Sequence, residues 1–166
     1  MVDRRLALAS GFVRFPNEMA QYTLDPDRPL IVAAAGVDTG EAFGVIEQVI
    51  PPGVGPRQHI HHIADELFYI LSGTFTFQIG DLHASGGTGT VAFAPHGVAH
   101  TWMNTGDEPG RMLFVFSPAG FEQYLVRRSE LLDGARMVDT LDAVAAHYQT
   151  TYVGSPLSVS RVTPGN

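Results

Sequence analysis

Seven short segments between residues 30 and 116 have the residue types of β-strands, and turn-forming residues separate most of them. Aliphatic residues, aromatic residues and threonine dominate the segments, whereas Gly, Pro, Asn and Asp cluster in the gaps. Many short strands at close spacing are typical of a sandwich or barrel and not of alternating strands and helices. The sequence therefore predicts an all-β fold, with strands at residues 30–35, 43–50, 66–71, 74–79, 90–94, 100–104 and 111–116.

The two ends of the chain differ from this central part. The first 29 residues contain several prolines, and we expect an irregular N-terminal arm there. After Pro118, apolar residues recur at helical spacing in 119–132 and again after Asp139, whose carboxylate can cap a helix. We expect two short helices that cover an edge or opening of a barrel, and an extended tail from 154 to 166. The predicted organisation is an arm at 1–29, a barrel at 30–117, and C-terminal helices and tail, packed on the barrel, at 118–166.

Composition restricts the partners and the chemistry. The 166 residues suffice for one domain with its own core, and the formal net charge of −7, with no block of Lys or Arg, argues against a nucleic-acid partner. No segment reaches the roughly 20 apolar residues that a membrane span needs, so we expect no membrane partner and a cytoplasmic location by default. Cysteine is absent, which leaves histidine and carboxylate side chains to hold any metal ion.

Histidine is concentrated in one part of the chain, because six of the seven lie between His59 and His100. His59 and His61 are two residues apart, so in a strand they point to the same face, while His62 points to the other. Two imidazoles side by side cannot both be buried and protonated without a large cost in free energy. A shared cation removes this conflict, because neutral imidazole is the commonest protein ligand for metals.

Two further residues can complete such a ligand set. Glu66 begins a strand whose other residues are apolar or aromatic, so a carboxylate on the inner face of this strand needs a positively charged partner. After the Pro-X-Gly turn at 95–97, a new strand places His100, Trp102 and Asn104 on one face. A hairpin that returns beside the first strands brings His100 to the fourth ligand position.

Ten positions in this region form two sets with characteristic spacing. The first set is Gly53, His59, His61, Glu66 and Gly73, and the second is Gly89, Pro95, Gly97, His100 and Asn104. The two sets resemble the two motifs of the cupin family. This resemblance implies a single-domain protein with a double-stranded β-helix, or jelly-roll, barrel of roughly six to eight strands. It also implies a metal ion inside the barrel near one mouth, with His59, His61, Glu66 and His100 as its ligands.

Four further segments, at residues 61–73, 104–109, 116–122 and 153–157, resemble the small quercetin 2,3-dioxygenase-like cupins. They indicate a subgroup and not a substrate. The expected cofactor is one divalent metal ion per chain, and its nitrogen and oxygen ligands suit Fe, Mn, Ni, Co or Zn. One or two coordination positions should stay open, because a purely structural zinc site more often uses thiolates.

The leading hypothesis from this resemblance is a metal-dependent dioxygenase that acts on a flavonol-like or polycyclic aromatic enol substrate. The ion lowers the pKa of the substrate hydroxyl, and the resemblance implies that Glu66 accepts the proton. Phe68 and Trp102 share faces with the ligands and are candidates for the apolar wall of a substrate pocket. Two alternatives stay open: a non-oxidative cupin isomerase or polyketide cyclase, and a non-enzymatic small-molecule-binding cupin.

The other histidines have no predicted part in the site. We expect His62 and His147 on the surface, and His83 and His96 in or beside turns. Exposed edge strands of such barrels are commonly covered by a second subunit. We therefore expect a homodimer that uses the N-terminal arm or the outer sheet.

Overall fold

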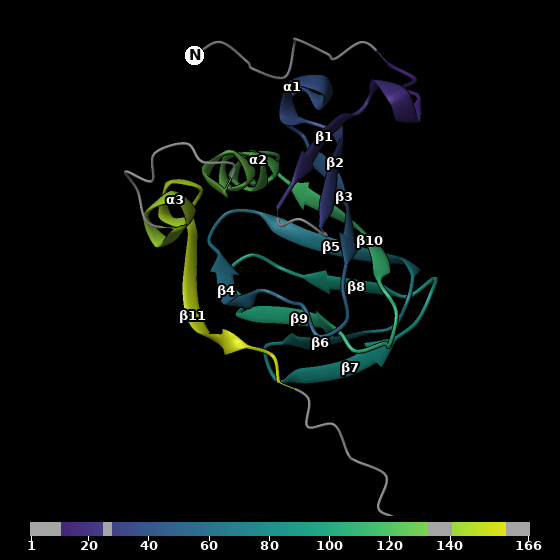
Figure 1. Ribbon diagram of the computed structural model, residues 1–166. Helices are drawn as coiled ribbons and strands as arrows, with labels where there is room; N and C mark the ends of the chain where they lie inside the picture. Colours follow the sequence, from purple (N-terminus) through teal and green to yellow (C-terminus); the bar gives the residue numbers. More distant parts are fainter. Residues whose placement is uncertain (1–10, 25–27, 133–140, 159–166) are drawn as a thin grey trace, which may run out of the picture.

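The computed structural model describes residues 11–24, 28–132 and 141–158, and the statements below refer to these residues. Within them the chain forms two antiparallel sheets around a shared core (Figure 1). The strands are β1 (Ala20–Thr23), β2 (Pro29–Ala34), β3 (Gly44–Ile50), β4 (Arg57–His61), β5 (Asp65–Ser72), β6 (Phe75–Ile79), β7 (Leu82–Gly86), β8 (Val91–Ala94), β9 (His100–Asn104), β10 (Gly110–Ser117) and β11 (Thr150–Pro156). The six-stranded sheet has the order β1-β2-β3-β10-β5-β8, and the five-stranded sheet has the order β11-β4-β9-β6-β7. This is the predicted all-β jelly-roll architecture.

Helices occupy one end of the barrel and the entrance to it. The longest is α2 (Phe121–Leu132), and α3 (Leu141–His147) leads directly into β11, which returns along β4 (Figure 1). The N-terminal part contributes only the 3-10 helix η2 (Pro16–Glu18) and the short helix α1 (Gly36–Thr39). Of these described helices, none has the length and apolar character that crossing a membrane requires.

The predicted alternation of side chains is observed in the central strands. In β3 and β10, every second residue is buried and its neighbours are more exposed. The inward residues meet in an aromatic core, in which the Phe68 ring lies 5.4 Å from Phe77 and 5.6 Å from Phe114, centre to centre. This contact joins the two sheets, and the Phe68 ring also lies 6.2 Å from the His100 ring of β9.

Three strands lie where the sequence predicts turns or irregular chain. β1 lies within the arm that was expected to be irregular, β7 covers the expected turn region around His83, and β11 extends into the expected tail. All three are edge strands of their sheets, and two of them are almost fully exposed. β1 and β7 have no buried residue, and β11 buries only Thr150, so these strands lack the apolar alternation on which the prediction rests.

Gly55, just before β4, brings two parts of the barrel into close contact. A Cβ atom at this position would overlap the backbone carbonyl oxygen of Trp102 in β9. Only glycine fits this approach, which holds the start of β4 against β9. The close packing matters for the site, because His59 of β4 is directly opposite His100 of β9 in the sheet register.

Candidate metal centre

Four side chains from three strands converge inside the barrel near the end covered by α2. β4 supplies His59 and His61, β5 supplies Glu66 and β9 supplies His100. All four side chains are buried, with exposed fractions of 5% or less. One potential ligand atom from each lies within 4.8 Å of those from the others. The structure thus brings together all four residues predicted as ligands.

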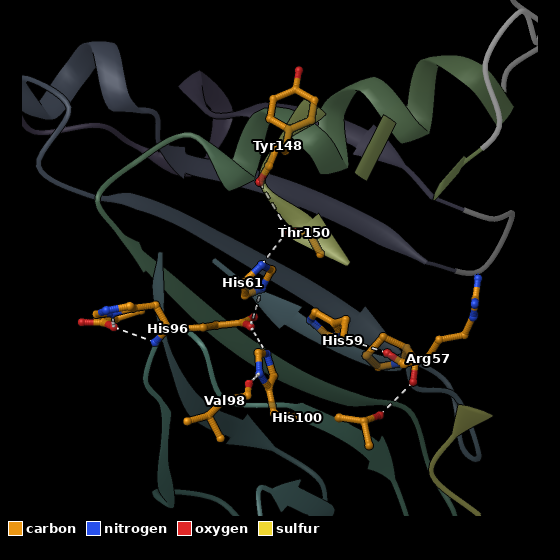
Figure 2. A network of polar contacts seen from close by, with 12 residues as sticks. Arg57, His59, His61, His96, Val98, His100, Tyr148 and Thr150 are labelled. Carbon is orange, nitrogen blue, oxygen red and sulfur yellow. Dashed lines mark hydrogen bonds and ion pairs between the residues drawn. The ribbon is translucent and has the colours of Figure 1, made fainter. Parts of the chain in front are cut away.

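Glu66 lies at the centre of this cluster. Its Oε2 atom is 2.9 Å from Nε2 of His100 and 3.1 Å from Nε2 of His61. The His59 ring is 4.4 Å from the His100 ring, centre to centre. Figure 2 shows the labelled rings of His59, His61 and His100 grouped around one point. Two residues apart in β4, His59 and His61 point to the same face, as the strand periodicity predicts.

Each imidazole is oriented by a hydrogen bond on its outer nitrogen. Nδ1–H of His59 donates to the Arg57 carbonyl at 2.8 Å, and Nδ1–H of His100 donates to the Val98 carbonyl at 2.9 Å. Nδ1 of His61 is 2.8 Å from Oγ1 of Thr150 in β11 (Figure 2). These bonds place the hydrogen on Nδ1 and direct Nε2 of each ring towards the centre, as metal-binding histidines require.

Thr150 is itself fixed in the role of acceptor. Its hydroxyl donates to the Tyr148 carbonyl at 3.3 Å, so that its oxygen is free to accept from Nδ1–H of His61 (Figure 2). The residue is 2% exposed. Sequence analysis missed it, because a threonine in an edge strand with no apolar alternation carries no signal of this contact.

The charges of the cluster are strongly coupled. Burial, reinforced by the nearby His100 and His61, lowers the pKa of His59 to about 3. Burial alone would raise the pKa of Glu66, but the hydrogen bonds from His100 and His61 outweigh it and hold this pKa below its ordinary value. For His100, burial lowers the pKa, but the hydrogen bond and charge of Glu66 outweigh burial and raise it. Without a metal, Nε2 of an imidazole can donate to Glu66 only when that ring carries hydrogen on both of its nitrogens.

This arrangement fits a divalent metal ion. Three imidazole nitrogens and one carboxylate oxygen are a donor set that suits Fe, Mn, Ni, Co or Zn. A divalent cation would also compensate the buried Glu66 carboxylate, which otherwise depends on hydrogen bonds from His61 and His100. The buried His59, His61, Glu66 and His100 cluster could therefore bind one metal ion.

A cavity of about 210 Å³ opens next to the cluster. His59 and Glu66 contribute to its lining, so two of the candidate ligands face this space. The C-terminal elements supply much of the wall, although they were expected only to cover the barrel. The residues around the cavity are Arg28, Gln48, Gly55, Pro56, Arg57, His59, Glu66, Trp102, Phe114, Phe116, Phe121, Tyr124, Leu125, Arg128, Asp142, Tyr152 and Pro156.

The two aromatic residues proposed for the pocket wall have different positions. Trp102 lines the cavity and is 5% exposed. Phe68 is fully buried and packs between Phe77, Phe114 and His100. It is not among the described residues that surround the cavity, and instead supports the His100 ring from below.

The remaining histidines lie outside the cluster. His62 is exposed and contacts Oγ1 of Thr151 at 2.8 Å, and His83 and His147 are exposed as well. His96 has a contact that the sequence did not indicate, because its Nδ1 is 2.7 Å from the Asp65 carboxylate at the surface. Asp65 precedes Glu66 but points the other way, so this ion pair belongs to the outside of the barrel.

Comparison with known proteins supports the fold. Residues 46–116, from β3 to β10, match the family model of the cupin domain. This match spans less than half of the chain, so residues 46–116 are similar to a cupin domain, in agreement with the jelly-roll fold. The curated relative Protein SchB from Streptomyces halstedii is 30% identical over 91 residues, which are 55% of this chain. The match spans 64% of SchB, so the chain covers less than two thirds of that relative.

Solved structures with the same fold are much more distant in sequence. KdgF from Halomonas sp. has a TM-score of 0.60 and 17% identity, over 69% of this chain and 99% of KdgF. An RmlC-like cupin from Shewanella frigidimarina has a TM-score of 0.57 and 16% identity, over 69% of this chain and 96% of that protein. At these identities the similarity establishes the jelly-roll fold and not a reaction.

Proposed function

We propose that the chain is a metal-dependent cupin enzyme, and that its most favoured reaction is the oxygenative ring cleavage of a flavonol-like or polycyclic aromatic enol. The observation that carries this proposal is the opening of the metal-binding cluster into an aromatic cavity. His59 and Glu66 line the space, and Trp102, Phe114 and Phe121 form part of its wall. A flat aromatic molecule in this cavity would meet the ligand cluster at one end.

When held by His59, His61, Glu66 and His100, a divalent ion supplies Lewis-acid chemistry that lowers the pKa of a bound substrate hydroxyl. The protein's own side chains perform the remaining tasks. Trp102 and Phe114, whose rings contact each other at 5.4 Å between centres, form an apolar wall against which an aromatic ring can pack and which excludes water. The two oxygen atoms that such a cleavage inserts come from one molecule of dioxygen, so no other oxidant is needed.

Glu66 is the candidate proton acceptor. Its carboxylate is 3% exposed, lines the cavity and is hydrogen-bonded at Oε2 by two imidazoles. A substrate hydroxyl that enters the cavity towards the cluster would therefore meet a carboxylate. No other carboxylate among the described residues is both buried in the cluster and in contact with the cavity.

The size of the cavity restricts the substrate. A buried cavity of about 150 Å³ accommodates a single benzene ring. The 210 Å³ of this cavity therefore correspond to about two fused aromatic rings. A flavonol, with three rings, would have to extend beyond this cavity.

Oxygen consumption tests the proposal. Metal-free protein should be loaded separately with Fe(II), Mn(II), Ni(II), Co(II) or Zn(II) and incubated with flavonols and naphthols, with and without dioxygen. We expect at least one redox-active ion to support loss of substrate with stoichiometric oxygen uptake. When the dioxygen carries an oxygen isotope label, the label should appear in the product. Turnover that does not depend on oxygen, or binding without turnover for every ion, would rule the reaction out.

A second candidate is a non-oxidative isomerase or cyclase, and one contact favours it. The hydroxyl groups of Tyr124 and Tyr152 are 2.6 Å apart, and both residues line the cavity. Burial and the hydrogen bond to Tyr152 raise the pKa of Tyr124, so its hydroxyl stays protonated and can serve as a donor to a substrate oxygen. Activity of the zinc-loaded protein without dioxygen would favour this candidate.

A further inference from the structure

Gln48 is a buried polar residue at a position where the pattern of β3 calls for an apolar one. Every second residue of β3 points inward, and the inward neighbours of Gln48 are Ile46 and Ile50. Gln48 is 4% exposed and lines the cavity, and its side-chain amide has no hydrogen-bond partner among the residues that the structure describes. Because Gln48 lies on the cavity wall, a ligand in the cavity can supply the hydrogen-bond partner of this inward amide.

Arg128 of α2 also lines the cavity. Its Nε atom is buried and has no hydrogen-bond partner within the described part of the chain. Arginine usually satisfies this donor with a carboxylate. Here Arg57 pairs with Asp142, whereas Arg127, beside Arg128 in α2, pairs with Glu130. Of the carboxylates described, none pairs with Arg128.

The register of the sheet adds a third group to this wall. Gln48 is opposite Leu30 of β2, two residues after Arg28, and Arg28 also lines the cavity. One strand pair therefore places an amide and a guanidinium on the cavity, and α2 adds a second guanidinium. Of these groups, the Arg128 guanidinium and the Gln48 amide are donors of the kind that recognise a carboxylate. The same cavity is lined by His59 and Glu66 of the ligand cluster and by aromatic residues that include Trp102.

From this juxtaposition we infer that Gln48 and Arg128 form a carboxylate subsite, and that the ligand is a small aromatic acid. Its ring occupies the aromatic part of the cavity, its hydroxyl or enol oxygen faces the ligand cluster, and its carboxylate accepts from Arg128 and Gln48. The inference rests on the proposed function in one respect, because it takes the cavity as the substrate site. It adds that the substrate carries a carboxylate. It applies equally to an oxygenative and to a non-oxidative reaction.

A matched pair of probes tests the subsite by equilibrium binding. 6-Hydroxy-2-naphthoic acid and its primary amide have nearly the same size and shape, and differ in charge at the end opposite the hydroxyl. Calorimetric titration into the zinc-loaded full chain, without dioxygen, gives the ratio of their dissociation constants. We expect the acid to bind at least about tenfold more tightly, since hydrogen bonds between charged groups are the stronger ones.

Two neighbouring arginines in α2 provide the control. Arg128→Gln should weaken binding of the acid and leave binding of the amide unchanged, so that the ratio of dissociation constants falls to about one. Arg127→Gln, which removes an exposed ion pair, should retain the full ratio. Gln48→Leu, which keeps the buried volume, provides a second variant should Arg128→Gln fail to fold. Gln48→Leu should also weaken binding of the acid more than binding of the amide.

Three results would overturn the subsite: equal binding of acid and amide to the unsubstituted protein, no binding of either probe, or a ratio that Arg128→Gln and Gln48→Leu leave intact. The measurement needs neither turnover nor oxygen, so its failure is distinct from failure of the proposed oxygenation. A preference for the acid in a protein that consumes no oxygen would keep the subsite and remove only the reaction.

Discussion

Oγ1 of Thr150 lies 2.8 Å from Nδ1 of His61, which connects the last described strand of the chain to the centre of the candidate metal site. Thr150 is opposite His61 in the β11–β4 register. The side chain thus fixes which nitrogen of His61 carries hydrogen, and leaves Nε2 directed at Glu66. The C-terminal segment therefore takes part in the site instead of merely covering the barrel.

Removal of this hydroxyl should weaken metal binding. Thr150→Val keeps the shape and the β-propensity of the side chain, but leaves Nδ1 of His61 without its acceptor. We expect the affinity for a divalent ion to fall by about 10- to 100-fold. Competition with a chromophoric chelator measures the change.

The adjacent residue offers the control for that prediction. Thr151 makes the same kind of bond, at 2.8 Å, to His62 on the exposed side of β4. Thr151→Val should leave metal affinity within about twofold, because His62 has no part in the cluster. Equal losses for both variants would show that Thr150 acts through strand pairing and not through His61.

Metal binding should release a proton near neutral pH. In the metal-free protein, Glu66 raises the pKa of His100, so His100 carries a proton up to a higher pH than an ordinary histidine. The metal needs the Nε2 lone pair and therefore displaces this proton. Release should be largest below the raised pKa of His100 and should disappear as the pH rises above it. Calorimetry in two buffers with different ionisation enthalpies measures the proton count.

Glu66→Gln gives the internal check on this mechanism. Without the carboxylate, His100 loses both contributions of Glu66 to its charged form and keeps only the bond to the Val98 carbonyl, while its burial still disfavours that form. Proton release at pH 7 should then decrease, along with the affinity for the metal. Unchanged release in Glu66→Gln would contradict the assignment of the proton to His100.

The N-terminal arm should contribute pH-dependent stability through Asp38. Both guanidinium nitrogens of Arg14 donate to the Asp38 carboxylate at 3.0 Å, and the Ala35 N–H donates to it at 2.9 Å. The bonds from Arg14, and then that from Ala35, lower the pKa of Asp38. A lowered pKa contributes stability above the ordinary value of 3.8, and this stability is lost as the pH falls through the folded-state pKa.

Asp38→Asn should accordingly cost about 1 kcal/mol of unfolding free energy at pH 7, and much less near pH 3. Urea unfolding followed by circular dichroism at the two pH values provides the comparison. A cost that is the same at both would assign the effect to packing and not to the charge of Asp38.

The edge strand β8 bears on the expected homodimer. Its outward side chains Val91 and Phe93 are 57% and 51% exposed, and β8 is the last strand of its sheet. We expect light scattering at micromolar concentration to give the mass of two chains, and Phe93→Lys to shift the equilibrium towards one chain. A single-chain mass for the unsubstituted protein would defeat this prediction, and a dimer unaffected by Phe93→Lys would place the interface elsewhere.

The sequence was sufficient for the barrel and for the four clustered side chains. Strand periodicity places His59 and His61 on one face, and the spacing of turns brings Glu66 and His100 back to them. These signals are local and strong, because an inward polar residue in an apolar strand needs an explanation.

The rest of the site depends on pairings between distant parts of the chain. Thr150, Tyr152 and Arg128 belong to C-terminal elements whose docking on the barrel no local pattern specifies. Gln48 is an intermediate case. Its inward position follows from the alternation in β3, and the same argument that singled out Glu66 could have found it.

Metal content of the purified chain tests the central claim most directly. After growth in medium with added Fe, Mn, Ni, Co and Zn, plasma mass spectrometry should find one divalent ion per chain in the unsubstituted protein and in His62→Ala. His100→Ala and Glu66→Gln, each confirmed as folded, should lose most of it. The claim that these buried side chains form a metal site would be contradicted by either of two results. One is a full ion content in folded His100→Ala and Glu66→Gln, and the other is an unsubstituted chain that takes up no ion.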